Sequence, residues 1–228
     1  MQYFNIAIDG PAGAGKSTIA KAAAAKLGFI YVDTGAMYRA MALYALEKKI
    51  SPEDEAEIEK ACSQADITIV YQDGKQQIIL NGQNVSEQIR TEEVGNMTSK
   101  ISVYLPVRKK MVELQRQLAG NANVIMDGRD IGTCVLPNAQ AKIYLTADTR
   151  VRAARRMKEL EEKGNLCSLE AIEADIMERD YRDMHREHSP LKQAEDAVYL
   201  DTSHMNPEQV VEQIIAIARK QGLCLAVP

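Results

Sequence analysis

Short apolar runs alternate with longer amphipathic stretches along the chain. "YFNIAID" (residues 3–9) and "FIYVD" (residues 29–33) predict buried strands, because each is a short apolar run bounded by polar residues or glycine. Between them, Ser17–Leu27 is rich in alanine and predicts a helix that Gly28 ends. A second helix is expected to be capped by Thr34 or its neighbour. This order of elements, with short connections, predicts a parallel sheet with right-handed crossovers.

The alternation is interrupted in the middle of the chain. A charged helix is expected at about residues 52–65, and "ITIVYQDGKQQIILNGQNVS" follows it. In this segment the pairs Asp73-Gly74 and Asn81-Gly82 separate β-rich runs, as is typical of tight hairpins. We therefore predict a small antiparallel insert at about residues 66–91.

The second half of the chain returns to the α/β pattern. Two more core strands are predicted by "NVIMD" and "AKIYLT", and a fifth strand is predicted by "AVYLD". Ser168 is expected to cap a long helix that runs to about Arg186, and Pro207 to begin the last helix. We expect one domain over residues 1–228, a three-layer α/β/α fold around a five-stranded parallel sheet.

Composition and charge exclude several classes of protein. The 228 residues are 46% hydrophobic and 26% charged, as in soluble globular proteins. The formal net charge of −4 argues against broad binding to nucleic acid or to an anionic membrane. We expect a cytoplasmic location, since neither a secretory leader nor an apolar stretch of about 20 residues is evident. Four widely spaced cysteines indicate reduced thiols rather than zinc ligands or disulfides.

A glycine-rich segment after the first predicted strand carries the clearest chemical signal. Gly10–Ser17 matches G-x-x-x-x-G-K-S, a pattern in which backbone amides and the start of a helix cradle phosphates. Lys16 would reach the β and γ phosphates, and the Ser17 hydroxyl can ligate Mg²⁺. The residues expected to bind ATP are Gly10, Pro11, Ala12, Gly13, Ala14, Gly15, Lys16, Ser17 and Thr18.

A second polar segment, "DGRDIGT", follows the third predicted core strand. Asp127 stands at the carboxyl end of that strand, where parallel sheets present ligand-binding groups. It could orient the Mg²⁺ shell, directly or through water, or the phosphate-binding loop. Arg129 and Asp130 would project into the cleft beyond it, although a turn with a neutralising ion pair is the alternative interpretation.

Two sets of arginines suggest a second anion. Arg179, Arg182, Asp183 and Arg186 fall at helical spacing i, i+3, i+4 and i+7, which predicts one shared helix face. An earlier predicted helix carries a similar set, Arg152, Arg155 and Arg156. A solvated helix face is the usual explanation for such runs. In a chain that also carries a triphosphate site, however, arginines beyond those that ATP requires favour an acceptor with its own phosphate.

The segments "GPAGAGKST", "YVDTGAMYRA", "DGRDIGT" and "ERDYRDMHR", in this order, resemble the bacterial cytidylate kinases along essentially the whole chain. The resemblance implies a P-loop core and ATP-dependent phosphorylation of CMP and dCMP with Mg²⁺. It also implies an acceptor-binding region enlarged by the insert and a helical lid at about residues 150–168. The chain has Thr34 where the family motif often has serine, so the hydroxyl is kept.

The resemblance also implies roles for single residues. Ser99, Arg108 and Asp130 would read cytosine, Arg39 and Arg129 would bind the acceptor phosphate, and Arg179 and Asp183 would bind the sugar side, with Thr34 also in the substrate site. Lys16, Arg129 and Arg186 would act on the transferring phosphates, and Arg155 and Arg156 would close over them from the lid. We expect a monomer, because no oligomerisation seam is conspicuous.

Two alternatives remain open at the level of the sequence. The protein could be a kinase for another small acceptor, such as a different nucleoside monophosphate or a hydroxylated acid. It could also be a GTP-binding switch, although the guanine-reading pattern Asn-Lys-x-Asp does not occur in the chain.

Overall fold

The computed structural model describes residues 3–72, 75–162, 164 and 167–224. The chain divides into two compact units, which are described separately below. The first comprises Met1–Tyr31 and Ala119–Pro228, and the second comprises Val32–Leu118.

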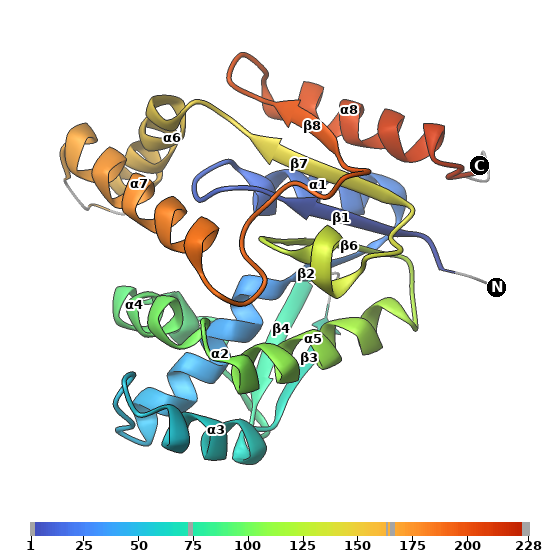
Figure 1. Cartoon of the computed structure of the whole chain (residues 1–228). Coiled ribbons are helices and arrows are strands. Elements are labelled where there is room, and N and C mark those ends of the chain that lie inside the picture. The colour runs from blue at the N-terminus through green and yellow to red at the C-terminus, as the bar shows by residue number, and fades with distance from the viewer. Residues whose placement is uncertain (1–2, 73–74, 163, 165–166, 225–228) are drawn as a thin grey trace. The chain divides into compact units, whose positions relative to one another are not determined.

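A five-stranded parallel sheet forms the centre of the fold, as predicted (Figure 1). Its strands stand in the order β2-β6-β1-β7-β8. Their bounds are β1 Asn5–Asp9, β2 Ile30–Asp33, β6 Val124–Gly128, β7 Ala141–Thr146 and β8 Val198–Asp201. All five coincide with predicted strands to within two residues. In the register of β1 and β6, Ile8 pairs with Asp127 and Asp9 pairs with Gly128. Two aspartates therefore stand at the carboxyl ends of neighbouring strands.

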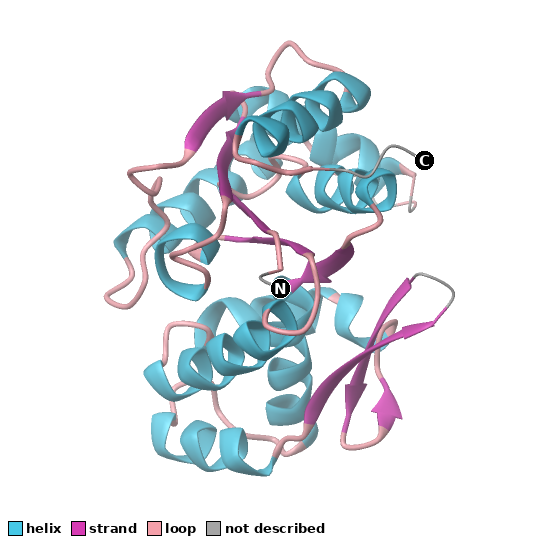
Figure 2. Ribbon diagram, turned by 90° about the vertical axis from the view of Figure 1, so that its right-hand side faces the viewer, coloured by secondary structure: helices cyan, strands magenta, loops and turns pink. Residues whose placement is uncertain are grey.

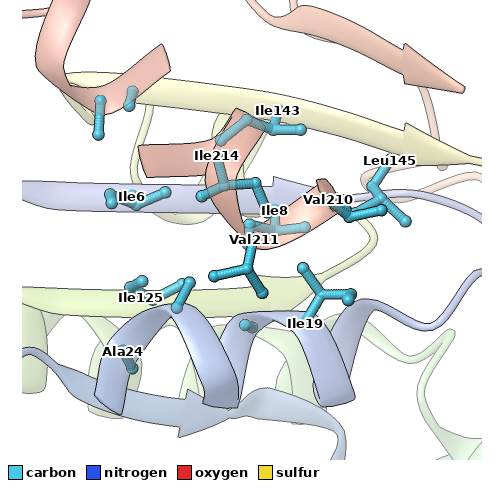
Figure 3. Packing of buried hydrophobic residues seen from close by; sticks show 14 of the residues in the cluster. Ile6, Ile8, Ile19, Ala24, Ile125, Ile143, Leu145, Val210, Val211 and Ile214 are labelled. Atoms are coloured by element: carbon cyan, nitrogen blue, oxygen red, sulfur yellow. The ribbon is translucent and has the colours of Figure 1, made fainter. Parts of the chain in front are cut away.

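Two helices cover one face of this sheet, α1 (Lys16–Leu27) and α8 (Pro207–Lys220). Figure 3 shows Ile8 and Ile143 of the sheet packed against Val211 and Ile214 of α8. Each fully buried side chain of this size contributes about 1.5 to 3 kcal/mol relative to an exposed one. This apolar layer therefore holds β1 in place, and β1 leads into the glycine-rich segment.

The ends of these helices agree with the sequence signals. Gly28 ends α1 with a φ of 66°, the left-handed conformation that glycine adopts at little cost. Asn206 and Gln209 form a capping box at the start of α8, directly before Pro207.

Two further helices, α6 (Thr149–Glu161) and α7 (Leu169–His185), pack against each other in the first unit (Figure 1). Ser168 caps α7 by accepting a hydrogen bond from the backbone N–H of Ala171, as predicted. The helix ends one residue earlier than expected, because Arg186 has an extended backbone with a ψ of 144°. Of the predicted lid, residues 163, 165 and 166 lie outside the described residues.

The second unit contains the small antiparallel sheet that the sequence predicts (Figure 2). Its strands are β3 Ile67–Gln72, β4 Lys75–Leu80 and β5 Gln83–Asn84. Asn81 and Gly82 join β4 to β5 with φ angles of 48° and 81°, as a tight hairpin requires. The other predicted turn, residues 73–74, lies outside the described residues.

The rest of the second unit is helical. Its helices are α2 Thr34–Glu47, α3 Glu55–Gln64, a 3₁₀ turn Gln88–Arg90, α4 Glu92–Ile101 and α5 Leu105–Ala119. Asp33, the neighbour of Thr34, caps α2 by accepting from the backbone N–H of Ala36. In the described part of the chain, no helix is both long and apolar enough to cross a membrane.

Candidate active site

The glycine-rich segment forms the loop between β1 and α1. Gly10 lies so close to β7 that a Cβ atom there would stand 1.9 Å from the carbonyl oxygen of Leu145. Gly13 and Gly15 have φ angles of 72° and 83°, which side chains rarely permit. The loop therefore leads directly into the first turn of α1. At the start of a helix, the backbone N–H groups and the helix dipole favour an anion.

Lys16 is buried at the start of α1, and its Nζ atom donates to the carbonyl oxygen of Pro11 at 2.7 Å. Burial holds the pKa of Lys16 well below its ordinary value, and the charges of Arg129 and Arg179 act in the same direction. A phosphate beside this ammonium would offset both effects. The local field is thus suited to a polyanion although the chain as a whole is acidic.

A hydroxyl and a carboxylate meet beside the lysine. Ser17 donates from Oγ to Asp127 at 2.8 Å, and the Tyr31 hydroxyl donates to the other carboxylate oxygen at 2.9 Å. Oxygen donors of this kind are the ligands that Mg²⁺ prefers. Ser17 and Asp127 therefore fit a magnesium ion that accompanies a bound nucleotide.

Asp9 is a functional residue that the sequence reasoning missed. It is buried at the end of β1 and accepts hydrogen bonds from the backbone N–H groups of Ile131 and Gly132, both at 2.7 Å. Burial raises its pKa to about 6, although the two hydrogen bonds act in the opposite direction. Asp9 thus anchors the unpredicted π-helical turn Ile131–Val135 that follows Arg129 and Asp130.

Four charged side chains near this turn form a cluster, here called the Arg–Asp cluster: Arg129, Asp130, Asp183 and Arg186. Arg129 donates to Asp183 at 2.7 Å, and Arg186 contacts Asp130 at 3.3 Å and Asp183 at 4.0 Å. The side chains of Asp130 and Arg186 are only 7% and 6% exposed. The cluster unites residues that directly follow β6 with residues at the end of α7, more than 50 positions apart in the sequence.

The charges of the Arg–Asp cluster stabilise one another. Burial raises the pKa of Asp183, but Arg129, Arg179 and Arg186 together lower it, so that its pKa lies below the ordinary value. Burial likewise lowers the pKa of Arg129, whereas Asp183 raises it, and the net shift is upward. Arg129 and Asp183 therefore each stabilise the charged form of the other.

The arginines that were predicted to share a helix face have different positions and partners in the structure. Arg186 lies beyond the end of α7, and Arg182 is exposed and pairs with Glu178 at 3.6 Å. On α6, Arg155 donates to the backbone oxygen of Thr202 at 2.7 Å, and Arg156 is exposed beside Glu159. Arg152 is buried. Helical spacing predicted a common face, but tertiary contacts give each arginine a different environment.

Arg179, a further predicted substrate residue, lies on α7 in the first unit, whereas the other four lie in the second unit. On α2, Arg39 donates to the backbone oxygen of Ile89 at 3.1 Å, and its guanidinium lies beside Gly95 of α4. Arg108 of α5 is buried, with its guanidinium 5.8 Å from the ring centroid of Tyr38. Thr34 is buried at the start of α2, and Ser99 is half-buried on α4. The unit thus carries predicted substrate residues on three of its helices, α2, α4 and α5.

A parallel sheet whose first strand leads through G-x-x-x-x-G-K-S into a helix defines a P-loop nucleotide-binding protein. The family profile for cytidylate kinase matches residues 6–220. The chain belongs to the cytidylate kinase family, and it is therefore a phosphotransferase that uses nucleotides.

Individual proteins agree with this assignment. The chain is 50% identical over 216 residues to a cytidylate kinase of Lactobacillus johnsonii, covering 95% of this chain and 94% of that relative. It is 47% identical over 220 residues to a cytidylate kinase of Caldicellulosiruptor bescii, covering 96% of this chain and 97% of that relative. A solved structure of an uncharacterised protein from Eubacterium ventriosum shares the fold, with a TM-score of 0.52 and 11% identity over 96% of this chain and 99% of that chain.

Proposed function

We propose that the protein transfers the γ-phosphoryl group of ATP to the phosphate of CMP or dCMP, giving ADP and CDP or dCDP. The observation that carries this proposal is the Arg–Asp cluster, which lies in the same compact unit as the phosphate-binding loop. The field of Arg129 reaches Lys16, so that the loop and the cluster are electrostatically connected. Membership of the cytidylate kinase family supports cytidine as the base of the acceptor.

On the donor side, residues 10–18 bind the phosphates of ATP through backbone amides and Lys16. Ser17 and Asp127 would hold Mg²⁺, Asp127 directly or through water, and the ion would neutralise the charge that develops on the phosphates. Tyr31 keeps the carboxylate of Asp127 oriented through its 2.9 Å hydrogen bond. Arg155 and Arg156, from the lid at about residues 150–168, act on the same phosphates.

On the acceptor side, the family resemblance assigns Arg129 and Arg39 to the monophosphate and Thr34 to the substrate site. Asp130, Ser99 and Arg108 read cytosine, and Arg179 and Asp183 bind the sugar side. A carboxylate accepts from the exocyclic amine of cytosine, whereas uracil presents a carbonyl oxygen there. Asp130 therefore disfavours UMP through repulsion between lone pairs.

Phosphoryl transfer requires mainly orientation and stabilisation of charge. Lys16, Arg129 and Arg186 supply three positive charges around the transferring group. The acceptor phosphate is already largely ionised at neutral pH, so no strong general base is needed. We further propose that the enzyme works as a cytoplasmic monomer in which the lid excludes water from the reacting groups. The insert at about residues 66–91 would enlarge the acceptor-binding region.

The proposal is tested by measuring ADP release from Mg²⁺ and ATP with CMP, dCMP, UMP, AMP or no acceptor in parallel. We expect CMP and dCMP to accelerate release strongly, with smaller effects of UMP and AMP. Stimulation by a different acceptor would redirect the assignment to another small-molecule kinase. Release that is indifferent to every acceptor would contradict the proposal.

A further inference from the structure

The phosphate-binding loop is tied to α6 and α7 by two buried side chains that the donor and acceptor assignments above do not use. These are Arg152 of α6 and Asp180 of α7, which are 5% and 7% exposed. Their side chains meet at 2.6 Å between Arg152 Nη1 and Asp180 Oδ2. Such a buried ion pair is costly to form unless its remaining donors and acceptors are also satisfied.

Both residues complete their hydrogen bonding at one residue of the loop. Asp180 Oδ1 accepts from the backbone N–H of Ala12 at 2.9 Å, and Arg152 Nη1 donates to the backbone oxygen of Ala12 at 2.7 Å. The N–H and the carbonyl of Ala12 are thus both held by charged groups. Hydrogen bonds to charged groups are stronger than those between neutral groups.

The ion pair is itself fixed from the helix side. Arg152 donates from Nε to the backbone oxygen of Ala147 at 2.9 Å and from Nη2 to the hydroxyl of Thr149 at 3.0 Å. Ile176 of α7 also lies against the loop, where a Cβ atom at Gly13 would meet its Cδ1 atom at 3.4 Å. The guanidinium therefore has little freedom, and Ala12 has one preferred position relative to both helices.

We propose that Arg152 and Asp180 are positioning residues that set the conformation of the phosphate-binding loop for ATP and couple it to α6 and α7. This inference rests on the proposed function in that it takes ATP as the ligand of the loop. Since the pair holds the backbone of Ala12, a displaced pair changes the direction of the loop amides. The affinity for ATP then falls by more than the affinity for the acceptor.

The chain provides a matched control. Arg150 and Glu173 also join α6 to α7, at 4.0 Å, and they are more exposed, at 68% and 26%. Breaking this second pair disturbs the contact between the same two helices without removing a hydrogen bond to Ala12. Glu173→Ala therefore reports the effect of the helix contact itself.

The test compares Asp180→Asn with Glu173→Ala and the unaltered protein. Asp180→Asn keeps the size of the side chain but places an amide N–H₂ or a neutral oxygen against Arg152. We expect the Kd for ATP, measured by calorimetry without acceptor, to rise about tenfold or more. The KM for CMP stays within about twofold, and Glu173→Ala changes neither constant. The amide proton signal of Ala12 also shifts upfield in Asp180→Asn, because its acceptor loses its charge.

If Asp180→Asn does not fold, the double variant Arg152→Met, Asp180→Leu replaces the pair by apolar side chains and leaves no buried charge unpaired. The same weakening of ATP binding is expected in that variant. A folded variant of either kind that binds ATP as tightly as the unaltered protein overturns the inference. Because calorimetry with ATP uses no acceptor, a failure of CMP to stimulate turnover counts against the proposed function and not against this coupling.

Discussion

At the scale of single residues, the same side chain acts differently in different surroundings. Asp9, Asp127 and Asp183 are all carboxylates, but they accept from backbone amides, from hydroxyls and from a guanidinium respectively. Asp9 has a raised pKa, because burial outweighs its two backbone hydrogen bonds. Asp183 has a lowered pKa, because three arginines together outweigh the effect of burial.

Asp130→Asn tests how the base is read. The proposal assigns Asp130 to the exocyclic amine of cytosine, and a good contact to a base edge contributes about 1 to 3 kcal/mol of discrimination. We expect the ratio of kcat/KM for CMP to that for UMP to fall by about 5- to 150-fold. Asp183→Asn is the matched control, since it alters a sugar-side carboxylate of the same cluster and should reduce both rates alike. An unchanged ratio in Asp130→Asn would remove this residue from base reading.

Asp9→Asn tests the cost of the buried carboxylate. The folded state raises the pKa of Asp9 from its ordinary value of 3.8 to about 6, so folding takes up a proton between these values. The contribution of Asp9 to stability therefore falls as the pH rises through this range, and the full penalty is present at neutral pH. We expect the free energy of unfolding of Asp9→Asn, relative to the unaltered protein, to increase by an amount on the order of 3 kcal/mol between about pH 4 and pH 7.

Chemical denaturation at several pH values measures this difference. Asp201→Asn serves as the control, because a hydrogen bond from Ser203 holds the pKa of Asp201 below its ordinary value. Its relative stability should not change between about pH 5 and pH 7. A difference for Asp9→Asn that is equally independent of pH would show that Asp9 is not strained by its burial.

At the scale of elements, the site depends on how closely β1, β7 and the phosphate-binding loop approach one another. Gly10 stands directly against the backbone of Leu145, whereas Gly15 has open space around its Cα atom. Both have positive φ angles. The two glycines therefore separate the effect of a steric contact from that of backbone conformation.

Gly10→Ala should destabilise the fold more than Gly15→Ala. A Cβ atom at residue 10 would lie 1.9 Å from the oxygen of Leu145, so β1 and β7 would have to separate. We expect a loss of about 3 kcal/mol or more for Gly10→Ala, as for overpacking in a core. For Gly15→Ala, the left-handed backbone alone costs about 1 to 2 kcal/mol. Urea denaturation of the two variants measures both values, and equal losses would contradict the close approach at Gly10.

Local signals identify the elements well and the contacts between them poorly. The strands, the Gly28 helix end, the Ser168 cap and the Asn81-Gly82 hairpin depend on neighbouring residues, and all were predicted. The role of Asp9 depends on amides more than 120 positions away, which no local pattern reveals. One signal was present, since "IAIDG" and "VIMDG" place an Asp-Gly pair at the end of two adjacent strands.

The arginines show the same limit. Helical spacing grouped Arg152 with Arg155 and Arg156, but burial against the phosphate-binding loop distinguishes Arg152 from the other two. Spacing also placed Arg186 on α7, which ends one residue before it. The sequence identifies which residues carry charge near the site, whereas tertiary contacts determine which of those charges pair with one another.

At the scale of the whole molecule, an acidic chain with a net charge of −4 carries local basic sites in both compact units. The first unit holds the phosphate-binding loop and the Arg–Asp cluster, and the second holds Arg39 and Arg108. Positive groups in excess of those that one triphosphate requires are explained by an acceptor that is itself a phosphate. The destination of the transferred group is therefore the central claim.

The most direct measurement follows the label from [γ-³²P]ATP in the presence of Mg²⁺ and CMP. We predict that the label appears in the β-phosphate of CDP, with one labelled CDP formed per ADP and little labelled inorganic phosphate. Replacing CMP by dCMP should give labelled dCDP. Label found in inorganic phosphate, at the same rate with and without CMP, would contradict the account, because water and not the nucleotide would then be the acceptor.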